Sequence, residues 1–189
     1  DEVFFKPEHC WVVGILTKFL TYTTHPESEM LVLRLKPGGA SAIMHGDVSG
    51  YTDRFVNAGD VWNDAILTLR EELIARTEPA EKLQLVEDWY LDNRDPGRIP
   101  EPIVLQIADL IQRNATQDLS EAFKASSISQ KHLIHLFKKR IGVTPKQLQR
   151  IARFQELLER IQAGHLISWA QISADCGYYD QAHFIRDFK

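Results

Sequence analysis

The chain has few cysteines and no apolar run long enough to cross a membrane. Only two of its 189 residues are cysteines, Cys10 and Cys176, and neither has a second cysteine at metal-ligand spacing. Their wide separation argues against a disulfide, which favours a reducing compartment. No apolar stretch approaches the roughly 18 residues that a membrane-spanning helix needs, and no secretory leader is recognisable at the start. We therefore expect a cytoplasmic protein without a membrane partner.

Motifs typical of enzymes are missing as well. Gly38 and Gly39 lack the lysine and the further glycines of a phosphate-binding loop, so a turn that ends a strand is the better interpretation. His45 and Asp47 could form one edge of a metal site, but no third ligand accompanies them. No Ser/His/Asp or Cys/His set stands in the context of a nucleophile. We expect a protein that is not an enzyme and has no catalytic residue, cofactor or metal site.

Acidic residues are absent from one long stretch of the chain. The net charge is −4, yet no Asp or Glu lies between Ala122 and Gln155. The basic residues of this stretch are Lys124, Lys131, Lys138, Lys139, Arg140, Lys146, Arg150 and Arg153. A local field of one sign suits a polyanion such as nucleic acid. For a basic run alone, a solvated helix surface is an equally good interpretation.

A helix-breaking segment divides the chain. Asn93–Pro102 contains three prolines and a glycine, which end helices on both sides. We therefore predict two domains, residues 1–96 and residues 97–189. Their charge also differs, since residues 1–100 have a balance of −7 and residues 101–189 a balance of +3.

The first domain is predicted to be α+β. Residues 3–36, including Leu31–Leu35, are rich in the β-branched, aromatic and large aliphatic residues typical of strands. Residues 60–92 repeat apolar residues at helical spacing, and Pro79 is well placed to begin a second helix there. The chain opens at Asp1 within the strand-like stretch, so we expect this domain to be incomplete at its N-terminus.

The second domain is predicted to be all-α. Ser129 is a suitable N-cap, Gly142 a helix stop, and Thr144-Pro145 the start of a long helix. The predicted helices cover about residues 103–111, 119–123, 129–141, 145–163, 169–176 and 180–189. Short helices with brief joins are typical of a compact helical domain.

One residue pattern occurs twice, 51 residues apart. Each copy has a capping residue, an apolar residue at +4, an aromatic residue at +8 and a lysine at +9. The two copies are Ser129, Leu133, Phe137 and Lys138, and Asp180, Phe184, Phe188 and Lys189. Each follows a short helix and a tight turn, which is the plan of a helix-turn-helix unit.

Both repeated helices have the faces expected of helices that read a DNA groove. The predicted buried side chains are Leu133, Leu136, Phe137, Phe184 and Phe188. The predicted outward sets, at i, i+4 and i+7, are Lys131, His135 and Lys138, and Ala182, Arg186 and Lys189. His132 and His135 could alternatively form a metal pair. The long helix between the units would span about 30 Å, close to the roughly 34–36 Å between successive major grooves.

The C-terminal residues resemble the AraC/XylS family of transcription regulators. The resemblance is carried by Gly142–Pro145, by Arg153, and most specifically by Ile172–Phe184 with Arg186–Lys189. It covers about residues 103–189. It implies an all-α double helix-turn-helix domain with a long linker helix, asymmetric DNA binding by each protomer, and transcriptional control.

The resemblance also implies particular DNA contacts. The family's base-contacting positions fall on Lys131, Ile134, His135, Gln181, Ala182, His183 and Arg186. The residues expected to contact DNA phosphate are Ser129, Lys138, Lys139, Lys146, Arg150 and Lys189. Two departures stand out. Ser127 replaces a frequent glycine in the first turn, and the chain stops at Lys189, before the closing glycine, proline and last helix. We therefore expect an incomplete C-terminus.

The N-terminal residues resemble, more distantly, the sensor-like domain of one AraC-family branch. The relevant blocks are Arg34–Ala40 and Thr52–Val56, leading to Val61-Trp62. They imply regulation by a ligand or by dimerisation. We thus expect a DNA-binding regulator whose partners are double-stranded DNA and, as open alternatives, a small-molecule effector, RNA polymerase and a second copy of the chain. The alternative is a ligand- or protein-binding module with a weak or vestigial DNA-binding domain.

Overall fold

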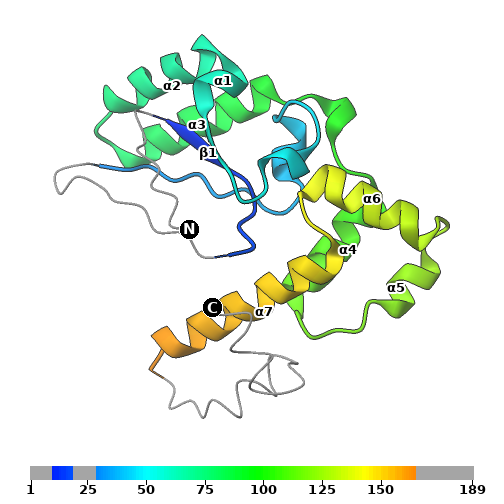
Figure 1. Cartoon of the computed structure of the whole chain (residues 1–189). Coiled ribbons are helices and arrows are strands. Elements are labelled where there is room, and N and C mark those ends of the chain that lie inside the picture. Colours follow the sequence, from blue (N-terminus) through cyan, green and yellow to red (C-terminus); the bar gives the residue numbers. More distant parts are fainter. Residues whose placement is uncertain (1–9, 19–28, 165–189) are drawn as a thin grey trace.

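The computed structural model describes residues 10–18 and 29–164 of the chain (Figure 1). The predictions for the second helix-turn-helix unit lie outside these residues. The described part begins with a small sheet and three α-helices and continues with four further α-helices. Nowhere in it does a helix combine the length and hydrophobicity that crossing a membrane would take.

The sheet pairs two strands that are distant in sequence. Strand β1 (Trp11–Val13) runs antiparallel to β2 (Phe55–Asn57), with Val12 opposite Val56. β-branched and aromatic side chains suit such a pleated surface. The expected mixture of strand and helix in the N-terminal part is therefore present.

The prediction of a strand at Leu31–Leu35 was wrong. This segment forms no regular element, and Val32 is 70% exposed. Strand propensity is expressed only where another strand satisfies the backbone N–H and C=O groups. Residues Phe55–Asn57, for which we predicted no strand, pair with β1 instead.

Three helices follow the sheet. These are α1 (Ala58–Trp62), α2 (Asp64–Ile74) and α3 (Pro79–Asn93). The predicted start of a helix at Pro79 is confirmed. The break between α1 and α2 was not predicted, and it occurs at Asn63, where φ is 51°. A positive φ is uncommon for residues other than glycine, and asparagine is one of the residues that adopt it more often than most.

Two tryptophans join α1 and α3 in the N-terminal core. The rings of Trp62 and Trp89 meet edge to face with centroids 5.2 Å apart, and Trp62 Nε1 donates to the carbonyl of Ile43 at 2.7 Å. These two aromatic side chains therefore act as core residues.

The C-terminal helices are α4 (Pro102–Arg113), α5 (Ser120–Ala125), α6 (Gln130–Ile141) and α7 (Pro145–Gln162). The predicted helix break at Asn93–Pro102 is confirmed, and it holds a short 3-10 helix, η3 (Pro96–Arg98). Helix α4 packs against both α6 and α7. The fully buried side chains at this junction are Val104, Ile107, Ile111, Leu133, Phe137, Ile141 and Val143.

Candidate nucleic-acid interface

Helices α5 and α6 and the turn between them form the first predicted helix-turn-helix unit. The hydroxyl oxygen of Ser129 accepts from the backbone N–H of His132 at 3.3 Å, so the predicted N-cap of α6 is confirmed. Ser127, in the turn, has no positive φ. A side chain at this position therefore costs no backbone strain where the family often has glycine.

Helix α6 separates an apolar face from a polar one. Leu133 and Phe137 are fully buried against α4, and Ile141 is 2% exposed, whereas Leu136 is only half-buried. On the opposite face Lys131, His132, His135 and Lys138 are exposed, and Ile134 is half-buried beside them. A buried stripe at i, i+4 and i+8 anchors the helix, so its N-terminal half offers cationic and imidazole groups to the outside.

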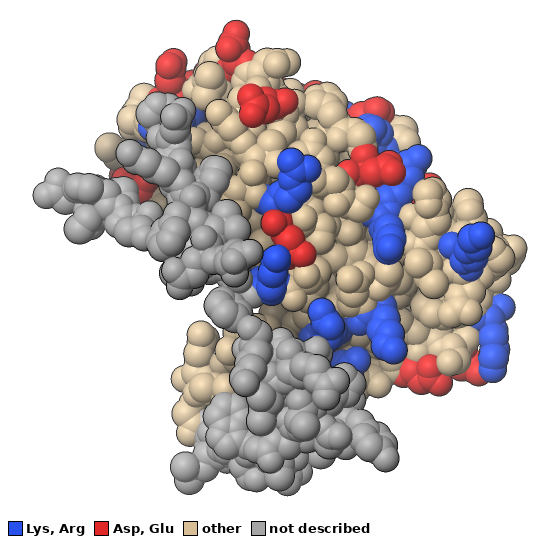
Figure 2. Space-filling view, in the orientation of Figure 1, with Lys and Arg blue, Asp and Glu red and all other residues tan. Residues whose placement is uncertain are grey.

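Exposed lysines of α6 and α7 add positive charge to the surface of this part of the molecule. Lys131, Lys138 and Lys146 take part in no ion pair with the residues that the structure describes. On the side shown in Figure 2, acidic side chains gather over the region of α1 to α3, while most Lys and Arg side chains lie over α4 to α7. Unpaired surface cations attract a phosphate backbone most strongly at low salt.

Arg140 belongs to the basic stretch but not to this exposed face. Its side chain is 14% exposed, and its guanidinium donates to both carboxylate oxygens of Glu101, at 3.1 and 3.3 Å. A further bond goes to the carbonyl of Arg98 at 3.3 Å. This arginine holds α6 to the segment before α4, so it is not available to DNA.

Helix α7 begins with a capping box. Thr144 accepts from the N–H of Gln147 at 3.2 Å, and Gln147 Oε1 accepts from the N–H of Thr144 at 2.9 Å. The predicted long helix is thus present, and its 18 residues correspond to about 27 Å. Lys146 is exposed and Arg150 half-buried on this helix.

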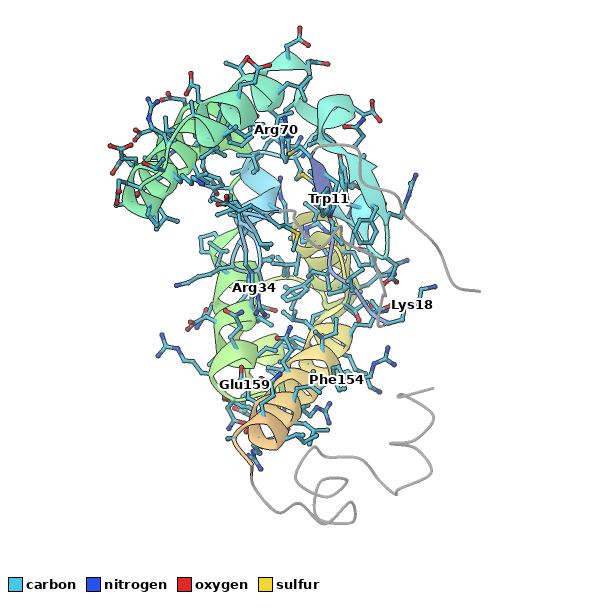
Figure 3. The ribbon with its side chains drawn as sticks, turned by 90° about the vertical axis from the view of Figure 1, so that its left-hand side faces the viewer. Trp11, Lys18, Arg34, Arg70, Phe154 and Glu159 are labelled. Carbon is cyan, nitrogen blue, oxygen red and sulfur yellow. The ribbon has the colours of Figure 1, made fainter. Side chains whose placement is uncertain are left out.

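The N-terminal part contacts the end of α6 that lies away from Lys131. Thr52 Oγ1 donates to the carbonyl of Gly142 at 2.8 Å. In Figure 3, Arg34 lies near α7, and its guanidinium donates to Gln155 Oε1 at 3.2 Å. These contacts were not predicted from the sequence. The one local signal was Gly142, predicted as a helix stop, whose φ of 107° lets the chain turn back toward the 3-10 helix η2 (Val48–Tyr51).

Other candidate sites do not assemble in the described residues. There, no three His, Cys, Asp or Glu side chains come close enough to hold a metal, so neither His45 and Asp47 nor His132 and His135 gain a third ligand. Partial burial raises the pKa of the Cys10 thiol, with the charge of Arg70 opposing it. A raised pKa disfavours the reactive thiolate.

The predicted base contacts Gln181, Ala182, His183 and Arg186, and the phosphate contact Lys189, lie outside the described residues. Residues 123–189 match a family model described as a helix-turn-helix domain. The match supports an AraC-type DNA-binding domain in this part of the chain, and a DNA-binding transcription regulator at the family level. That family is regulatory and not catalytic. No curated protein and no solved structure matches the chain.

Proposed function

We propose that this chain is a sequence-specific transcription regulator in which α6 is the first recognition helix. The observation that carries the proposal is the division of α6 into a buried face, anchored by Leu133 and Phe137, and an exposed face with Lys131 and His135 at its N-terminal end. Recognition helices of helix-turn-helix proteins present this end to the base edges of a major groove.

Each exposed group has a chemical role in this proposal. The Lys131 ammonium suits the O6 and N7 acceptors of guanine, and the apolar Ile134 suits a thymine methyl group. His135 can exchange a hydrogen bond with a base edge. Residues proposed to hold the phosphates are Ser129, Lys138, Lys139, Lys146, Arg150 and Lys189.

Helix α7 acts as the spacer to a second recognition helix. That helix would carry Gln181, Ala182, His183 and Arg186, and the amide of Gln181 suits adenine. The 18 residues of α7 span about 27 Å. Together with its flanking turns, this length is comparable with the roughly 34–36 Å between successive major grooves. One protomer could then read two neighbouring grooves. The N-terminal domain, residues 1–96, would regulate this binding in the cytoplasm through a ligand or a second copy of the chain.

The function can be tested with DNA selected from a random duplex library by the full chain. Lys131→Ala should relax base preference at one position, at a cost of about 1–3 kcal/mol on the best site. The measurement is fluorescence anisotropy on the selected duplex and its single-base variants. Lys124→Ala is the matched control, because it removes an exposed lysine of α5 that is paired with Glu121 and not predicted to touch bases.

Phosphate contacts should behave differently from base contacts. Arg150→Ala should weaken all duplexes alike and reduce the slope of log affinity against log salt by about 1. If selection yields no preferred sequence, or if Lys131→Ala preserves every preference of the parent, the proposal is wrong. A ligand- or protein-binding module with a vestigial DNA-binding domain then becomes the better description.

A further inference from the structure

A cavity of about 380 Å³ lies where the N-terminal part meets α4. One wall is the turn Lys36–Gly39, and another is the end of α3 with Tyr90 and Arg94. Residues Ile99 and Pro100, together with Leu105 and Ala108 of α4, complete it. This volume falls at the small end of the range typical of ligand sites.

The walls of the cavity are held in place by specific contacts. Gly38 has φ 92°, and a Cβ there would lie 2.9 Å from Leu105 Cδ2 and 3.1 Å from Pro100 Cγ. Any other residue would be strained at this φ, and the Leu105 side chain would have to move to make room for it. The Tyr90 hydroxyl donates to the carbonyl of Gly39 at 2.9 Å, which fixes the turn to α3.

The cationic groups that line the cavity lack an ion partner among the described residues, whereas its acidic group has one. Lys36 and Arg94 are both exposed and form no ion pair with other described residues. The single acid of the lining, Asp109, is already bound by Arg113 at 2.8 Å on the same helix. Two cations that form no ion pair with other described residues thus line a cavity whose other residues are mostly apolar. This arrangement is complementary to a small molecule with one anionic end and a short hydrocarbon body.

We propose that this cavity binds a small aliphatic or aromatic carboxylate, with its anionic group between Lys36 and Arg94 and its hydrocarbon part against Leu105 and Ala108. Ala108 also belongs to the core that anchors α6, and Gly38 lies close to Ile141 at the end of α6. An occupant would therefore touch both the N-terminal turn and α4, the helix against which α6 packs. A role of this site in regulating DNA binding rests on the proposed function. Binding of the carboxylate does not, because it requires no DNA.

The test uses hexanoate and benzoate as probes, with hexanamide and benzamide as uncharged controls of matched shape. Isothermal titration with the full chain, without DNA, should give saturable binding of at least one acid with a Kd on the order of 1 mM. The matching amide should bind at least about five-fold more weakly. Arg94→Gln and Lys36→Gln should each weaken binding of the acid by about five-fold. Arg76→Gln, in the segment between α2 and α3 and away from the cavity lining, should not.

Leu105→Phe fills the cavity and tests the location. This variant should abolish binding of the acid while its circular dichroism and melting temperature remain close to those of the parent. The proposal is overturned if neither acid binds, if acid and amide bind equally, or if Leu105→Phe binds as the parent does. Anisotropy with DNA, measured on the same preparations, reports separately on the proposed function, so either can fail alone.

Discussion

At the level of single residues, Arg140 differs in role from the lysines around it. It lies between Lys139 and Ile141 in the basic stretch, yet its guanidinium is directed at Glu101 and is mostly removed from solvent. Partial burial by itself would raise the pKa of Glu101. The hydrogen bond from Arg140, the Glu101 backbone N–H, and the charges of Arg140 and Lys139 together hold that pKa below its ordinary value of 4.5.

The lowered pKa of Glu101 predicts a dependence of stability on pH. Because the folded-state pKa lies below the unfolded one, the ionised carboxylate stabilises the fold above about pH 4.5, and this contribution is lost as the pH falls through the folded-state pKa. The free energy of unfolding of the parent should therefore exceed that of Glu101→Gln near neutral pH and approach it in acid. Urea denaturation between about pH 6 and pH 3 measures this difference.

Glu121→Gln is the matched control for this experiment. Glu121 pairs with Lys124 at 3.6 Å, but both side chains are well exposed on α5. Surface pairs of this kind contribute little to stability. If the difference in free energy of unfolding between the parent and Glu101→Gln stays constant over the whole pH range, the ion pair does not stabilise the junction of α4 and α6.

At the level of secondary-structure elements, helix α7 depends on the reciprocal hydrogen bonds at its first turn. Thr144→Ala removes the acceptor for the Gln147 N–H and should cost about 1 kcal/mol of stability. Chemical denaturation followed by circular dichroism measures this loss. Thr68→Ala is the control, because its hydroxyl donates to the Asp64 carbonyl on the exposed side of α2. Equal stability of the two variants would contradict a stabilising role for the cap.

The helices could largely be predicted from the sequence, whereas the strands could not. Ser129, Thr144-Pro145 and Gly142 mark helix ends through bonds within one or two turns, so these local signals were sufficient. The strand expected at Leu31–Leu35 did not form, and β2 at Phe55–Asn57 was missed. Strand formation depends on a distant partner, which composition does not specify.

At the level of the whole molecule, several contacts cross the predicted boundary at residue 96. Ile15 packs against the core of α4, α6 and α7, and the Ser41 hydroxyl donates to the carbonyl of Arg98 at 2.7 Å. The Thr52 hydroxyl bonds to the Gly142 carbonyl. The division into residues 1–96 and 97–189 remains a prediction, and these contacts favour coupled unfolding of the two parts.

Thr52→Val tests this coupling. Loss of the hydroxyl leaves the carbonyl of the buried Gly142 without this donor and should cost about 1 kcal/mol. We expect tryptophan fluorescence and far-ultraviolet circular dichroism to report one shared transition in the parent and in the variant, at lower denaturant for the variant. Thr77→Val, in the exposed loop before α3, should leave the midpoint unchanged. Two separate transitions in the parent would refute coupled unfolding.

The sequence alone determined where the helices of the first helix-turn-helix unit begin and end, and which face of α6 is apolar, because both follow from contacts between residues near in the chain. It also determined the basic stretch and the family resemblance. Only the tertiary structure decided that Arg140 faces Glu101, that Thr52 meets Gly142, and that Lys36 and Arg94 share a cavity. These outcomes depend on which distant segments pack together, and packing is a property of the whole chain.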